Sequence, residues 1–145
     1  RIGYVVVGAD CRNADKVFFA VCGAARELGF VCAPALFQYI IPECLGKTAD
    51  ICVYKKNRET LYTALTSIGY EVVYPDGAFY LFVKSLEKDS AKFAERAKKY
   101  ELLVVPSDDF GCYGYVRISY CVSPETVKNS IKAFEKLYYD YGGIK

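Results

Sequence analysis

The sequence predicts an α/β protein whose second part is an α+β domain, with a mixed or antiparallel sheet covered by helices mainly on one face. Three observations lead to this prediction. A long amphipathic helical pattern runs through residues 50–68, a strong β-hairpin signal follows it, and the stretch "GYVRISYCV" alternates as a strand before a last helix. After the long linking helix the predicted order is ββαβα. With 145 residues, 53% of them hydrophobic, the chain is long enough to bury a core.

The first part of the chain is predicted to contain one strand and two helices. Residues 2–7 form an apolar, β-branched run, which is typical of a strand covered on both faces. Apolar residues then recur at spacings of three and four over residues 13–28, so we expect an amphipathic helix that stops at Gly29. A second helix begins near Pro34, and Pro42 kinks or ends it.

The middle of the chain predicts a helix followed by a hairpin. The helix runs from Asp50 to Ile68 with Gly69 as its C-cap. Two strands, over residues 70–74 and 78–83, are joined by a Pro-Asp-Gly turn, and such a turn between apolar runs favours a β-hairpin.

The last part of the chain predicts two further helices and two further strands. One helix covers residues 89–100, and a strand over residues 102–105 is ended by Pro106. The strand "GYVRISYCV" comes next. Ser123, Pro124 and Glu125 then give the expected start of a helix, which is an N-cap, a proline in the first turn and an early acid.

The division of the chain into domains is predicted from this order of elements. Lysine is scarce before residue 46, and the hairpin-containing unit begins only after the long helix. We therefore expect one region over residues 1–48 and a second over residues 49–145. The sequence has no methionine and opens directly on a strand-like run, so we also expect it to be a piece of a longer protein.

The charge pattern excludes some kinds of partner. Lys plus Arg number 19 against 17 for Asp plus Glu, and these charges are scattered along the chain. A basic patch for nucleic acid is therefore not expected, and neither is a membrane partner, because the apolar runs are far shorter than the ~20 residues of a spanning helix. No signal-peptide pattern stands at the start, so the expected location is the cytoplasm.

Cysteine and histidine usage narrows the possible chemistry. The seven cysteines form no C-x-x-C pair, and they are expected to be small buried hydrophobic residues in a reducing compartment. The chain has no histidine, which removes Ser-His-Asp catalysis, most zinc sites and the usual base for a catalytic thiol. We expect no metal site.

Arg117 is the candidate functional residue of the "GYVRISY" strand. Strand side chains alternate, so Tyr115, Arg117 and Ser119 share one face while Val116 and Ile118 share the other, apolar face. A solvated or ion-paired arginine at a sheet edge would explain this residue without any function. A planar guanidinium is also suited to binding a carboxylate through two parallel hydrogen bonds.

Four stretches in order resemble the C-terminal part of the class I and II, fold-type I aminotransferases that use pyridoxal 5′-phosphate (PLP), the aspartate and aromatic amino-acid enzymes. They are "RIGYVVVG" at residue 1, "YPDGAFYLFV" at 74, "LLVVPSDDFG" at 102 and "GYVRISYCVSPETVKNSIKAF" at 114. The resemblance implies that the parent protein moves an amino group between an L-amino acid and a 2-oxo acid. It also implies that the parent is a homodimer with PLP as its cofactor.

The resemblance also assigns roles to particular residues. Arg117 matches the arginine that binds the α-carboxylate of the substrate, and Arg1 matches the arginine that binds the cofactor's phosphate. The Schiff-base lysine of the family lies upstream of the matched stretches, so no catalytic residue is expected here and the chain alone should be inactive. Residues 1–48 would end the large PLP-binding domain, and residues 49–145 would form the small domain. The loop "PSDDFG" departs from the family in its two aspartates, which argues against an acidic substrate side chain.

Two other functions stay open from the sequence. The chain could be a non-catalytic α+β module that regulates or binds a small ligand, because it lacks the family's lysine. It could also belong to a PLP-dependent lyase or decarboxylase of the same fold, since those enzymes share the carboxylate-binding arginine.

Overall fold

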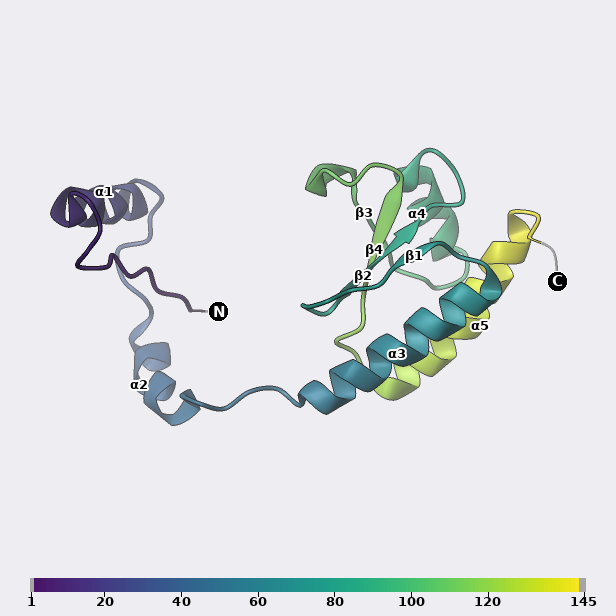
Figure 1. The fold of residues 1–145 in the computed structure, drawn as a ribbon, viewed down its shortest axis with the longest axis horizontal. Coiled ribbons are helices and arrows are strands. Elements are labelled where there is room, and N and C mark those ends of the chain that lie inside the picture. Colours follow the sequence, from purple (N-terminus) through teal and green to yellow (C-terminus); the bar gives the residue numbers. More distant parts are fainter. Residues whose placement is uncertain (1, 144–145) are drawn as a thin grey trace. The chain divides into compact units, whose positions relative to one another are not determined.

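The computed structural model describes residues 2–143, and its chain divides into two compact units, residues 1–48 (unit 1) and residues 49–145 (unit 2). Figure 1 shows the elements of each unit. Because the positions of the two units relative to one another are not determined, each is described by itself.

Unit 1 contains two helices, α1 (Ala14–Glu27) and α2 (Ala35–Cys44), which confirm the two predicted helices. Gly29 ends α1 in the left-handed region at φ 83°, where a residue with a Cβ would be strained. Its N–H donates to the carbonyl of Arg26, and the N–H of Phe30 donates to that of Ala25, which is the Schellman pattern. Pro42 lies inside α2, two residues before its end, so the helix continues past it.

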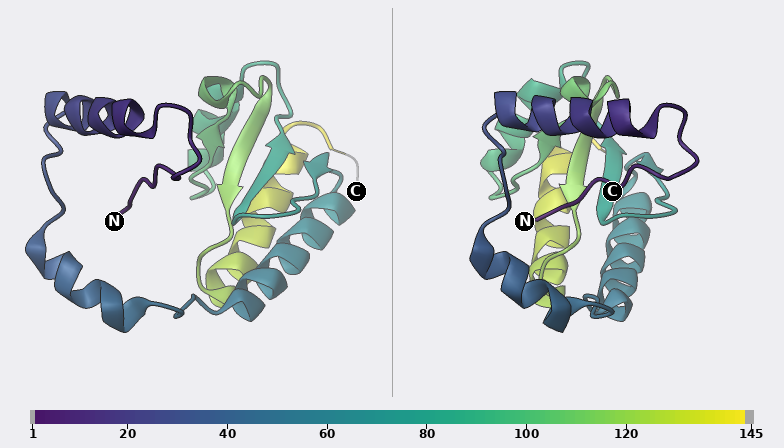
Figure 2. Two further views of the ribbon diagram at one scale, coloured as in Figure 1. Left: turned by 60° about the vertical axis from the view of Figure 1, so that its left-hand side comes forward. Right: turned by 90° about the vertical axis from the view of Figure 1, so that its left-hand side faces the viewer.

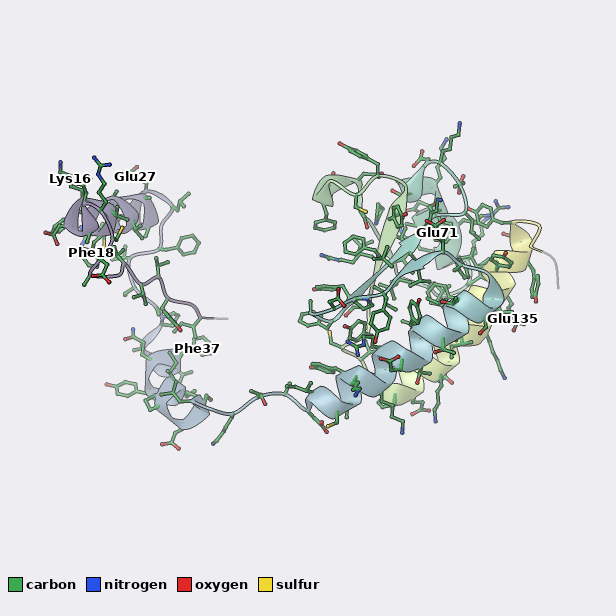
Figure 3. The ribbon with its side chains drawn as sticks, viewed as in Figure 1. Lys16, Phe18, Glu27, Phe37, Glu71 and Glu135 are labelled. Carbon is green, nitrogen blue, oxygen red and sulfur yellow. The ribbon has the colours of Figure 1, made fainter. Side chains whose placement is uncertain are left out.

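The predicted strand over residues 2–7 is wrong, because these residues have no regular secondary structure. A strand is stabilised by hydrogen bonds to a neighbouring strand, and residues 2–48 contain no second strand with which this run could pair. The β-branched composition is therefore not sufficient by itself. The same unit has no buried residue in either helix, and Phe18 and Phe37, labelled in Figure 3, are exposed.

Unit 2 contains three helices, four strands and one 3₁₀ turn within its described residues. In chain order they are α3 (Ile51–Ile68), β1 (Val72–Val73), β2 (Tyr80–Lys84), α4 (Ser90–Lys98), β3 (Val105–Pro106), η1 (Asp108–Phe110), β4 (Tyr115–Ser119) and α5 (Pro124–Asp140). The α+β fold class is confirmed. The order after α3 is ββαββα, because both β3 and β4 join the sheet. Both strands were predicted individually, and the predicted order ββαβα left one of them out.

The four strands form one sheet in the order β1-β2-β4-β3, and each neighbouring pair is antiparallel. The predicted hairpin is present, but its paired strands are shorter than expected: Val72 lies opposite Val83, and Val73 lies opposite Phe82. The predicted strand over residues 102–105 is reduced to β3. It includes Pro106 instead of ending before it, which is tolerated because β3 is an edge strand.

The helices of unit 2 begin at side-chain caps. The Asp50 carboxylate accepts hydrogen bonds from the N–H groups of Cys52 and Val53, and the Asp89 carboxylate caps α4 in the same way. Ser123 precedes Pro124, the first residue of α5, and its hydroxyl accepts a hydrogen bond from the N–H of Thr126. The starts predicted for these three helices are confirmed, because each N-cap satisfies backbone donors that have no partner inside the helix.

The core lies between the sheet and the helices of unit 2. Leu81 and Val83 of β2 and Val116 and Ile118 of β4 face the helices and are buried. Helices α3 and α5 lie side by side in Figures 1 and 2, and all three helices contribute to this cluster, with Leu61, Leu65, Phe93, Ala97, Val127, Phe134 and Leu137. The sheet therefore has one covered face and one face without helices.

A buried tyrosine joins the start of the hairpin to the last helix. The Tyr70 hydroxyl donates a 2.9 Å hydrogen bond to the backbone carbonyl of Phe134, and burial raises the pKa of this phenol above its usual value. Its ring also packs edge-on against the ring of Phe134.

The cysteines differ from the expectation that they are buried. Six of the seven are exposed, Cys112 is partly buried, and none forms a disulfide. Four of the exposed cysteines lie in unit 1, where none of residues 2–48 is buried. Among the helices that the structure describes, none has the length and apolar character needed to cross a bilayer.

Candidate carboxylate-binding site

Arg117 lies in the centre of β4 on the face of the sheet that the helices leave open. Its neighbours Val116 and Ile118 are buried in the core, so the alternation predicted for this strand is confirmed. Phe82 of β2 lies directly opposite Arg117 on one side, and Val105 of β3 lies opposite on the other. The two flanking strands fix the backbone from which the guanidinium extends.

Two aromatic rings pack against the Arg117 guanidinium. Its central carbon lies 4.3 Å from the ring centroid of Tyr80 and 4.3 Å from that of Phe110. Tyr80 belongs to β2 and Phe110 to the 3₁₀ turn before β4. A guanidinium over an aromatic face is attracted by the ring's quadrupole, and it keeps its N–H donors at the rim of the plane.

Lys84, the last residue of β2, is a second cation on this open face, and its environment is very different. Its ammonium is 2.7 Å from a carboxylate oxygen of Glu71, and the Tyr115 hydroxyl donates to the other oxygen at 3.1 Å. The hydrogen bond between Lys84 and Glu71 raises the pKa of Lys84 and lowers the pKa of Glu71. Within residues 2–143, no ion pair involves Arg117. Lys84 is thus neutralised by its own domain, whereas Arg117 is not.

The loop before β4 is organised by Asp108. One of its carboxylate oxygens accepts a 2.6 Å hydrogen bond from the buried Ser90 hydroxyl, and the other accepts from the N–H of Gly114 at 3.1 Å. Asp109 is exposed. Asp108 therefore holds the 3₁₀ turn in place, and its carboxylate is already engaged by two donors.

Asn57 of α3 ties the end of β4 to the helices. Its side chain is buried, and its amide nitrogen donates to the carbonyls of Tyr120 at 3.1 Å and Val122 at 2.8 Å. The Tyr120 hydroxyl in turn donates to the carbonyl of Ala78 at 2.9 Å. The sequence analysis did not identify Asn57. Its spacing of four residues from Leu61 places it on the buried side of α3, and a polar residue on that side needs hydrogen-bond partners.

The other predicted site residue, Arg1, lies outside the described residues. Within residues 2–48, the four cationic side chains Arg12, Lys16, Arg26 and Lys47 are all exposed. No group of acidic residues or cysteines in the described part of the chain is arranged to hold a metal ion.

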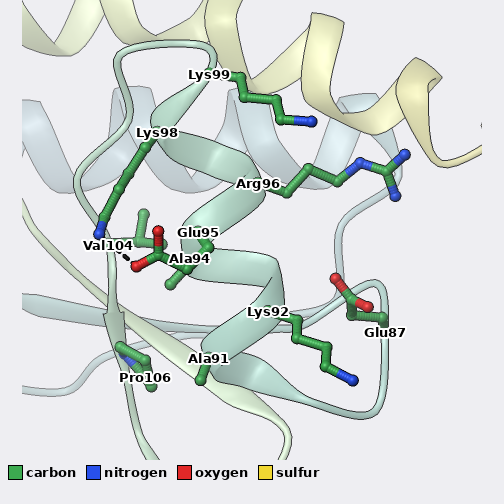
Figure 4. A pocket seen from close by; sticks show the side chains of 10 residues that line it. All are labelled: Glu87, Ala91, Lys92, Ala94, Glu95, Arg96, Lys98, Lys99, Val104 and Pro106. Atoms are coloured by element: carbon green, nitrogen blue, oxygen red, sulfur yellow. Dashed lines mark hydrogen bonds and ion pairs between the residues drawn. The ribbon is translucent and has the colours of Figure 1, made fainter.

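A surface pocket of about 680 Å³ lies along α4, and Figure 4 shows its lining. Lysines 92, 98 and 99 line the pocket, and so do Val104 and Pro106 at the edge of the sheet. Lys98 forms an ion pair with Glu95. Arg117 does not line this pocket, so the pocket is separate from the candidate site.

Comparison with known proteins gives a consistent assignment. Residues 1–134 match the family described as aminotransferase class I and II. The aspartate/prephenate aminotransferase of Thermus thermophilus is 34% identical over 86 residues, which is 58% of this chain and 22% of that protein. The probable N-acetyl-LL-diaminopimelate aminotransferase of Bacillus subtilis is 36% identical over 146 residues, 93% of this chain and 35% of that protein.

Solved structures resemble the chain as well. The crystal structure of an amino transferase from Eubacterium rectale is 55% identical, with a TM-score of 0.85 over 97% of this chain and 35% of that chain. An aspartate aminotransferase from Thermotoga maritima is 27% identical, with a TM-score of 0.75 over 86% of this chain and 34% of that one. The chain thus spans about a third or less of the length of these proteins. It belongs to the class I and II aminotransferases, a family of PLP-dependent enzymes.

Proposed function

We propose that this chain is the C-terminal part of a PLP-dependent aminotransferase that moves an amino group between an L-amino acid and a 2-oxo acid, and that Arg117 binds the substrate's α-carboxylate. The observation that carries the proposal is the environment of Arg117, whose guanidinium packs against two aromatic rings and has no carboxylate partner within residues 2–143. The relatives include an aspartate/prephenate aminotransferase and a probable N-acetyl-LL-diaminopimelate aminotransferase, and these descriptions support this substrate class.

The chemistry of Arg117 follows from its geometry. The guanidinium presents two parallel N–H donors to a carboxylate, and each charge-assisted hydrogen bond of this kind is worth roughly 1.5–3 kcal/mol. The contact fixes the position of the α-carboxylate, and so it limits the directions in which the rest of the substrate can extend. Arg117 therefore binds and orients the amino acid, and it neither donates nor accepts a proton, because a guanidinium stays charged.

Residues 2–143 do not by themselves form a site for PLP. The four cations of residues 2–48 are all exposed. Arg1 remains proposed as a ligand of the cofactor's phosphate, and the Schiff-base lysine belongs to the part of the full-length protein outside this sequence. The chain alone should then be inactive.

The proposed domain organisation follows the two units. Residues 1–48 would belong to the large PLP-binding domain and residues 49–145 would form the small domain, with the full-length enzyme a cytoplasmic homodimer. The self-contained core of unit 2 and the lack of buried residues in unit 1 support this division. A small domain with its own core can carry Arg117 as a rigid group.

Steady-state kinetics of the full-length enzyme test the proposal. Arg117→Ala should lower kcat/KM for amino acids by about a hundredfold or more, mainly through KM, because both hydrogen bonds to the carboxylate are lost. Lys84→Ala is the matched control: it removes a cation from the same face whose charge is already used by Glu71. An unchanged KM for Arg117→Ala would remove this residue from the substrate site.

A further inference from the structure

We propose that Tyr80 and Phe110 are positioning residues, whose rings fix the plane of the Arg117 guanidinium before any ligand arrives. This proposal rests on the proposed function of Arg117, because it explains how that residue would be held ready for a carboxylate. It assigns a role to two aromatic side chains that the sequence alone marked only as part of a strand and a loop.

The first ring reaches Arg117 across the β2–β4 pair. Tyr80 lies opposite Ser119, so it is the diagonal neighbour of Arg117, a position that aromatic and long side chains can bridge. The direct partner of Arg117 is Phe82, yet the rings found over the guanidinium in the described chain are those of Tyr80 and Phe110. The arginine side chain therefore leans along the sheet toward Tyr80. Phe79 supports this ring, with centroids 4.5 Å apart.

The second ring comes from the 3₁₀ turn. Phe110 is its last residue, and Gly111 ends the turn at φ 75°, a conformation that favours glycine. The Asp108 carboxylate holds the turn through Ser90 on α4 and the N–H of Gly114, the residue just before β4. The turn that carries the Phe110 ring is therefore held by hydrogen bonds at two places, and these keep the ring beside Arg117.

Two rings against one guanidinium restrict its motion more than one ring would. Rotation of the guanidinium about its Cδ–Nε bond would turn its plane relative to both rings at once, so the two contacts together limit this rotation. The donors stay at the rim of that plane, where a carboxylate can accept two of them. A long side chain that is ordered in advance loses less conformational freedom on binding, and this increases affinity without a new contact to the ligand.

The mobility of the Arg117 side chain tests this directly in the 145-residue chain. We would measure the ¹⁵N order parameter of the Arg117 Nε–H bond in Tyr80→Leu and Phe110→Leu. Each variant keeps an apolar side chain and removes a ring. The order parameter should fall from about 0.8 to below about 0.6 in both. Phe82→Leu is the matched control, since it changes the ring directly opposite Arg117, and it should leave the value unchanged.

Conservative variants separate positioning from folding. Tyr80→Phe and Phe110→Tyr retain a ring at each site, so they should keep the order parameter of the unmodified chain. If the leucine variants leave it unchanged, or if Phe82→Leu lowers it equally, the proposal is overturned. If a leucine variant loses the native circular dichroism spectrum, Tyr80→Ile or Phe110→Met serves the same comparison.

Kinetics of the full-length enzyme distinguish this proposal from the proposed function. Tyr80→Leu and Phe110→Leu should each raise KM for the amino acid about 5- to 10-fold, with Phe82→Leu unchanged. A large effect of Arg117→Ala together with no effect of either leucine variant on KM or on the order parameter would overturn positioning alone. No effect of Arg117→Ala on KM would overturn the proposed function, and the order parameters would still decide whether the rings hold the guanidinium.

Discussion

Units 1 and 2 have helices of similar amphipathic character but very different burial. Phe93 in α4 is 0% exposed, whereas Phe19 in α1 is 71% exposed, and no residue of either unit 1 helix is buried. The comparison shows that an amphipathic pattern predicts a helix in both units, but only unit 2 supplies a surface that covers the apolar side. The apolar side chains of the unit 1 helices are not covered by any other part of residues 2–48.

The helix caps follow the same division. Asp50, Asp89 and Ser123 cap the three helices of unit 2 with side-chain hydrogen bonds, whereas Asn13 and Pro34 at the starts of α1 and α2 make none. Unit 2 is therefore specified both locally and by its core. Unit 1 depends on contacts from outside itself.

Separating the units gives the largest expected effect. Residues 49–145 expressed alone should unfold in one cooperative transition, because the core cluster lies entirely within them. Residues 1–48 alone should show no cooperative transition, since none of residues 2–48 is buried. Circular dichroism during urea titration measures both. A sigmoidal transition for residues 1–48 would break the comparison.

The next largest effect comes from a core leucine. Leu65 is 0% exposed, and Leu65→Ala should lower the free energy of unfolding by about 2–5 kcal/mol, because a cavity is left in a packed core. Leu28→Ala removes the same atoms from a side chain of unit 1 that is 73% exposed, and it should change the value by less than about 0.5 kcal/mol. Denaturant unfolding of the whole chain measures both, and equal effects would contradict the proposed difference between the units.

A buried polar residue gives an intermediate effect. Asn57→Ala should destabilise the protein by about 1–3 kcal/mol, because the carbonyls of Tyr120 and Val122 lose their amide donor in a buried place. Asn129 is the control, since it is an exposed asparagine on α5. Hydrogen exchange should also show faster opening around β4 in Asn57→Ala and not in Asn129→Ala. Uniform protection in both variants would rule out a role for Asn57 in holding β4.

The smallest expected effect is at a helix cap. Ser123→Ala should cost about 1 kcal/mol, because the N–H of Thr126 loses its acceptor at the start of α5. Asn13→Gly, at a position with no cap hydrogen bond and φ 59°, should change stability by only a few tenths of a kcal/mol. Thermal unfolding measures the pair, and a larger loss for Asn13→Gly would show that α1 is capped after all.

Local chemistry was the part of this fold that could be predicted from the sequence. Asp50, Gly69 and the Ser-Pro-Glu start near residue 123 were read correctly because capping depends on a few neighbouring atoms. The strand predicted over residues 2–7 was wrong, because strand formation depends on a partner strand outside the local sequence. The predicted extent of β3 was wrong for the same reason, since pairing with β4 sets the length of this strand.

The candidate site was predicted only in part. The alternation of β4 placed Arg117 on the polar face, and the resemblance gave it a ligand. Tyr80 and Phe110 were missed because they meet Arg117 only through the β2–β4 register and the shape of the 3₁₀ turn. The role of Asp108 was also missed, because its partner Ser90 lies 18 residues earlier.

Pro106 also affects how the domain behaves at high concentration. It occupies the edge strand β3, where backbone donors would otherwise be open to an incoming strand from another molecule. Proline has no N–H and cannot extend the ladder at its own position, so this side of the sheet is a poor template for intermolecular β-pairing. When residues 49–145 are prepared alone, association through this edge should accordingly be disfavoured.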